Sequence, residues 1–176
     1  MKKHHLNLKV ANLLFIGQTL LASHGAEAWQ PVADKMMTTW GRQVTPANAW
    51  REYPRPQMER ADWQNLNGLW DYAITAKDAA QPTQWMGKIL VPFAVESTLS
   101  GVGQWLDAKQ ALWYRQAIRL SPKSGSRTLL NFEAADYQAT VWVNGRSMGA
   151  HTGGTNLVLT WPLDHTSYNL LTQTNA

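Results

Sequence analysis

Three acidic side chains are the first candidates for catalysis in this sequence: Glu96, Glu133 and Asp136. A carboxylate pair can do general acid–base or nucleophilic chemistry when its surroundings separate the two pKa values. Glu133 and Asp136, however, flank a short turn between two strand-like segments. A solvated strand end and a turn-capping Asp are the ordinary roles at such positions. We therefore predict no catalytic residue here, with a substitute acid–base pair as the alternative.

Metal, cofactor and Ser-His-Asp chemistry lack their usual patterns. His151 and His165 show no metal-ligand spacing, and the chain has no cysteine to join them. No Gly-x-Ser-x-Gly elbow is present, which a hydrolase of that fold would need. The pair Gly101-x-Gly103 lacks the third glycine and the following helix of a dinucleotide site. We predict no metal and no cofactor.

The tryptophans suggest carbohydrate binding, because apolar sugar faces pack on aromatic rings. All ten lie after residue 28. Trp70 and Trp142 fall within strand patterns, where packing in a core or a domain interface is the ordinary role. Trp85 and Trp105 lie in irregular stretches, and His151 lies near the end of a predicted hairpin, so these three are the candidate sugar contacts.

From residue 66 onward, short alternating segments separated by turn residues indicate an all-β fold. The clearest signal is Asn144-Gly145 between two alternating runs, which predicts a hairpin. No helical period interrupts the pattern, so we predict a β-sandwich of jelly-roll type. The expected strands cover residues 68–74, 88–93, 112–120 and 127–133 and the hairpin of residues 137–154.

The N-terminal part divides into two segments. Three early lysines, an apolar stretch from Val10 to Ala22 and the end Ala26-Glu27-Ala28 predict a signal peptide, residues 1–28, cleaved after Ala28. An amphipathic helix of the mature fold is the alternative. Cleavage lowers the formal net charge from +4 to +2 and implies a secreted or periplasmic protein. Residues 29–60, rich in Pro and Trp, predict an extended, irregular arm.

The same chain resembles the N-terminal sugar-binding domain of glycoside hydrolase family 2, of the β-galactosidase-like kind. The motifs that carry the resemblance, in the family's order, are Pro54 to Met58, Trp63 to Tyr72, Ile89 to Ser97, Leu112 to Arg115, Ala139 to Gly145 and the ending His151-x-Gly153-Gly154. The resemblance implies a galactose-binding-like jelly roll that binds and supports rather than cleaves. The implied partners are a β-linked glycoside and a catalytic domain of the same polypeptide. With a net charge of +2 and no cluster of Lys and Arg, we expect neither nucleic acid nor membrane as a partner.

In that family two glutamates on a (β/α)8 barrel cleave the substrate. A barrel of roughly 250 residues does not fit after Gly154, so we expect a truncated chain that is inactive alone. On the outward face of its strand, Arg115 either pairs with a nearby carboxylate or holds the sandwich against that barrel; we favour the second role.

The pattern departs from the family after Gly154. We expect the sandwich to cover residues 61–165 and an irregular tail, residues 166–176, produced by a change of reading frame near residue 155. A diverged closing strand is the alternative. Without final strands the sheet would have an open edge, which predicts marginal stability and association. Two other functions stay open: a free-standing carbohydrate-binding module and a non-functional gene fragment.

Overall fold

The computed structural model describes residues 29–52, 60–121, 128–133, 135, 137–153, 157–161 and 167–175. The predicted signal peptide, residues 1–28, lies outside the described residues. So do the motif Pro54 to Met58, Asp136 and His165.

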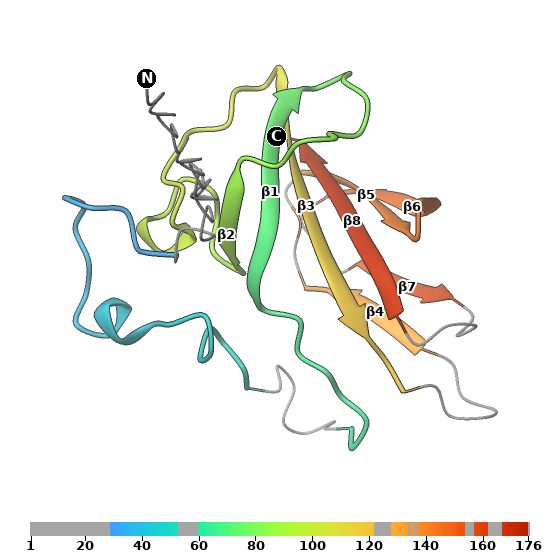
Figure 1. Cartoon of the computed structure of the whole chain (residues 1–176), viewed down its shortest axis with the longest axis horizontal. Coiled ribbons are helices and arrows are strands. Elements are labelled where there is room, and N and C mark those ends of the chain that lie inside the picture. The colour runs from blue at the N-terminus through green and yellow to red at the C-terminus, as the bar shows by residue number, and fades with distance from the viewer. Residues whose placement is uncertain are drawn as a thin grey trace, which may run out of the picture.

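In the part of the chain that the structure describes, eight strands form two antiparallel sheets, and the predicted all-β sandwich is confirmed. The large sheet has the order β2-β1-β3-β8-β5-β6, and β4 pairs with β7 in a second, two-stranded sheet (Figure 1). Among the described residues, two short 3-10 helices, η1 (Gly41–Gln43) and η3 (Thr98–Ser100), lie outside the sheets. The strand bounds are β1 (Gly68–Ala76), β2 (Gly87–Val91), β3 (Gln110–Arg119), β4 (Thr128–Phe132), β5 (Gln138–Val143), β6 (Arg146–Thr152), β7 (Leu157–Trp161) and β8 (Ser167–Asn175).

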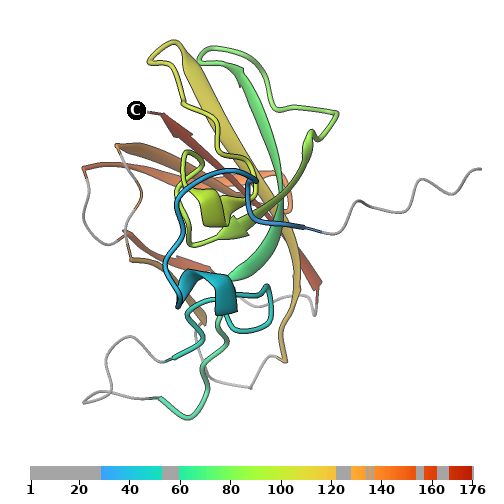
Figure 2. The ribbon, with the colours of Figure 1, turned by 90° about the vertical axis from the view of Figure 1, so that its left-hand side faces the viewer.

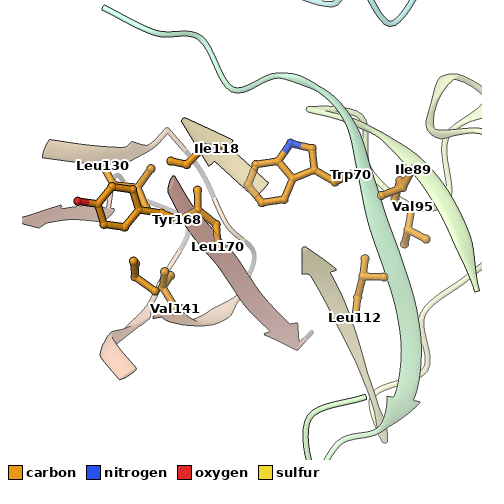
Figure 3. Packing of buried hydrophobic residues seen from close by; sticks show 10 residues of the cluster. Trp70, Ile89, Val95, Leu112, Ile118, Leu130, Val141, Tyr168 and Leu170 are labelled. Carbon is orange, nitrogen blue, oxygen red and sulfur yellow. The ribbon is translucent and has the colours of Figure 1, made fainter. Parts of the chain in front are cut away.

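Alternation along the strands gives the large sheet an inner face and an outer face. The inner face carries the main hydrophobic core, with Trp70 on β1, Leu112 on β3 and Leu170 on β8. Figure 3 shows Leu130 of β4 beside Tyr168, so the small sheet packs on this inner face. Burial of these side chains is the main term that stabilises the fold.

The predicted hairpin is confirmed as β5 and β6. Asn144 and Gly145 both have positive φ, 50° and 77°. This backbone matches a two-residue turn whose twist suits the flanking strands, and Asn-Gly adopts it with little strain. The Asn144 side chain also accepts a hydrogen bond from the Asn169 amide at 2.8 Å, which ties the turn to β8.

The predicted irregular tail is wrong for residues 167–175. These residues form β8, which pairs with β3 on one side and β5 on the other, in the middle of the large sheet. The alternative of a closing strand is therefore correct for this segment. Its polar composition hid an alternation in which Tyr168, Leu170 and Thr172 are all buried. Because β8 fills the middle of the large sheet, the edges of that sheet among the described strands are β2 and β6.

The described part of the arm is irregular, as predicted, and its first residues pack on the loop around η3 (Figure 2). Trp29 donates from Nε1 to the Ser100 carbonyl at 3.1 Å, and the Val32 amide donates to the Thr98 carbonyl at 3.0 Å. A Cβ at Gly101 would lie 2.5 Å from the Trp29 indole nitrogen, and φ there is +81°. Only glycine fits this close approach in that backbone conformation.

Candidate functional site

The three predicted sugar contacts do not form one site. Trp105 is 83% exposed in the loop between η3 and β3. Trp85 is half-buried just before β2, at one edge of the large sheet. His151 lies on β6, at the opposite edge, where it pairs with buried Ala139. Because β1, β3, β8 and β5 separate β2 from β6, no single small ligand contacts all three side chains.

The structure instead brings Trp85 together with three charged residues on the outer face. Cross-strand pairing places Asp71 of β1 between Lys88 of β2 and Arg115 of β3. Arg115 donates to Asp71 Oδ2 from Nε at 3.1 Å and from Nη2 at 2.8 Å. Lys88 Nζ lies 2.5 Å from Asp71 Oδ1. The Arg115 guanidinium carbon lies 4.4 Å from the centroid of the Trp85 ring, which is cation–π geometry.

These contacts set the protonation state of Asp71. Partial burial alone would raise the pKa of this carboxyl, but hydrogen bonds and charges from Lys88 and Arg115 outweigh burial and lower the pKa. Asp71 is therefore an ionised carboxylate at neutral pH. It can orient the two cations, but a group with a lowered pKa is a poor general acid.

Two further tryptophans extend this surface. Trp113 of β3 and Trp142 of β5 stack with ring centroids 5.4 Å apart and an interplanar angle of 28°. Trp113 donates from Nε1 to Thr75 Oγ1 at 2.9 Å and is buried, whereas Trp142 is half-buried. Leu171 of β8 and Trp85 pack against the same small cluster. We call the whole group the outer-face cluster: Asp71, Trp85, Lys88, Trp113, Arg115, Trp142 and Leu171.

Sequence reasoning singled out Trp85 and Arg115 but did not place them together or with the rest of the outer-face cluster. It left Arg115 with two roles and favoured contact with another domain; the structure shows the first role, pairing with a carboxylate. The usable signal was alternation, because Arg115 was predicted on the outward face of its strand and Asp71 alternates with Trp70 and Tyr72 in β1. What the sequence lacked was the strand order, which puts Asp71 opposite Arg115 and brings Trp142 across β8 toward Trp113.

The catalytic candidate Glu96 lies in the loop between β2 and η3. Glu96 contributes its negative charge near Tyr114, whose pKa is raised first by burial of the phenol and then by this charge. Among the residues that the structure describes, no group of three His, Cys, Asp or Glu side chains is placed to hold a metal ion. Within the same residues, no helix is long and apolar enough to cross a membrane.

The fold defines an all-β sandwich domain. The chain is 32% identical over 120 residues to the β-glucuronidase of Canis lupus familiaris, covering 58% of this chain and 18% of that protein. It is 29% identical over 131 residues to the β-glucuronidase of Sus scrofa, covering 65% of this chain and 20% of that protein. Among solved structures, β-glucuronidase from Faecalibacterium prausnitzii matches with a TM-score of 0.51 at 19% identity, covering 64% of this chain and 20% of that one. No protein-family model matches the sequence.

These similarities support an N-terminal domain of glycoside hydrolase family 2. It spans about a fifth of the length of the curated relatives that it matches. The four curated relatives are all named β-glucuronidase, whereas the resemblance in the sequence had suggested the β-galactosidase-like kind.

Proposed function

We propose that this domain binds carbohydrate and supports the catalytic part of a secreted family 2 glycoside hydrolase, without cleaving the glycosidic bond itself. The observation that carries the proposal is the match between this all-β domain and about a fifth of several β-glucuronidases. That match makes a β-glucuronide the preferred substrate class for the parent enzyme, in place of a β-galactoside.

The test is hydrolysis by the purified chain. We expect no release of p-nitrophenol from p-nitrophenyl β-D-glucuronide or from p-nitrophenyl β-D-galactoside. A β-glucuronidase on the same substrates is the positive control. Release that purifies with the chain would overturn the claim that this domain does not cleave.

We also propose that the protein is exported to the periplasm or beyond and cleaved after Ala28. The contact of Trp29 with Ser100 supports this position, because cleavage there leaves the anchored segment whole. Intact mass measurement of the exported protein should give a chain that begins at Trp29. A mass that includes residues 1–28 would contradict export with cleavage.

A free-standing carbohydrate-binding module is the second candidate function. The exposed ring of Trp105 favours it, because a bare indole on a loop can stack against a sugar. Tryptophan fluorescence of the purified chain should then change to saturation with a neutral oligosaccharide, and Trp105→Ala should remove the change. A response that Trp105→Ala leaves intact would dismiss Trp105 as the contact.

A further inference from the structure

The outer-face cluster lies on the side of the large sheet opposite the main core. Asp71, Ala73 and Thr75 of β1 pair in order with Arg115, Trp113 and Ala111 of β3, so all six side chains share this face. The side chains of Arg115 and Lys88 are 44% and 40% exposed, respectively. A molecule in solution can therefore reach both cations.

The charges on this face do not cancel. Two cations surround a single carboxylate, so the group formed by Asp71, Lys88 and Arg115 carries a net positive charge at neutral pH. Asp71 engages the Nε edge of the guanidinium, through Nε and Nη2. The other edge of the guanidinium is formed by Nη1 and Nη2. Its N–H groups point away from Asp71 and can donate to a ligand. Such a paired edge matches the two oxygens of a carboxylate.

The Trp85 ring holds this edge in a defined orientation. Its contact with the Arg115 guanidinium and the two bonds to Asp71 restrain the plane of the fork. A fork held before binding loses less entropy when a ligand binds. Beside it, the half-buried rings of Trp85 and Trp142 and the side chain of Leu171 offer apolar surface.

We propose that the outer-face cluster binds an acidic oligosaccharide, with a uronate carboxylate on Arg115 and Lys88 and an apolar sugar face against the neighbouring aromatic side chains. Charge complementarity selects this occupant over a neutral sugar, because the cluster carries unbalanced positive charge and oriented N–H donors. Asp71 and Trp85 are positioning residues that hold the guanidinium. The inference rests on the carbohydrate-binding role proposed above.

The test compares two ligands that differ only in their carboxylates. A tetramer of β-1,4-linked glucuronic acid and a tetramer of β-1,4-linked glucose of the same length are titrated into the purified chain by calorimetry. We expect the acidic tetramer to bind at least about tenfold more tightly at low salt, the size of one charge-assisted hydrogen bond. Its affinity should fall as salt rises, because the charges are exposed.

Substitutions then locate the site. Arg115→Gln should weaken binding of the acidic tetramer about tenfold or more, because it removes the charge and the fork. Arg119→Gln is the matched control, since Arg119 is exposed on the same strand and face. It should change the affinity less than about twofold. Arg115→Lys keeps the charge but not the fork, so an intermediate affinity would distinguish paired donors from charge alone.

Each contrary outcome overturns the inference. Equal affinity for both tetramers would show a neutral sugar site, which leaves the proposed carbohydrate binding intact. Equal losses in Arg115→Gln and Arg119→Gln would show diffuse attraction rather than a site. Binding of neither tetramer by a chain with a cooperative unfolding transition would mean that this face serves another purpose, such as contact with a protein domain.

Discussion

Replacing Leu170 by Ala tests the strand that the sequence did not predict. Leu170 has 0% exposure at the centre of β8 and belongs to the main core. The change removes a few buried carbon atoms at about 0.8 kcal/mol each and leaves part of their volume as a cavity. We expect the free energy of unfolding to fall by about 3 kcal/mol. Asn169→Ala is the matched control, because Asn169 is the residue before Leu170 and its side chain is exposed. This change should cost less than about 0.5 kcal/mol.

Urea unfolding followed by tryptophan fluorescence measures both changes. With a slope of about 2 kcal/mol per molar urea, Leu170→Ala should lower the midpoint by about 1.5 M and Asn169→Ala by less than about 0.25 M. If Leu170→Ala does not fold, Leu170→Val should still lose about 1 kcal/mol. Small and equal effects at positions 169 and 170 would refute a buried central strand, because both side chains would then be at the surface.

Two further predictions concern the arm and the outer-face cluster. Gly101→Ala should cost at least about 1 kcal/mol more than Gly145→Ala, because both glycines have positive φ but only a Cβ at Gly101 would meet Trp29. Equal losses in urea unfolding would show that the Trp29 contact adds nothing. The ionised Asp71 should make the wild type more stable than Asp71→Asn at any pH above 3.8, the pKa of a free Asp. Because the pKa of Asp71 is lower in the folded protein, this difference in stability should disappear as the pH falls through that lower folded-state value. A stability difference that stays constant from about pH 7 to about pH 2.5 would contradict the ion pairing of Asp71.

Local signals were enough for most of the strands. The alternation of Trp70, Tyr72 and Ile74 predicted β1, and Asn144-Gly145 predicted the hairpin of β5 and β6. Both depend on neighbours in sequence, because turn geometry and side-chain alternation are properties of a few consecutive residues. The same rule applied to β8, but its many Ser, Thr, Asn and Gln residues suggested an irregular tail. Pairing on both sides with β3 and β5 overrides that composition.

The sequence by itself determined the all-β class, the hairpin, the irregular arm and a resemblance to glycoside hydrolase family 2. It also marked Trp85, Trp105 and His151 as candidate contacts. Only the tertiary structure decided that these three lie apart and that Asp71, Lys88 and Arg115 meet around Trp85. The reason is that alternation assigns each side chain to a face of its own strand, whereas a shared site needs strand order and register. Strand order and register are set by pairing between segments far apart in the sequence, such as Asp71 with Arg115.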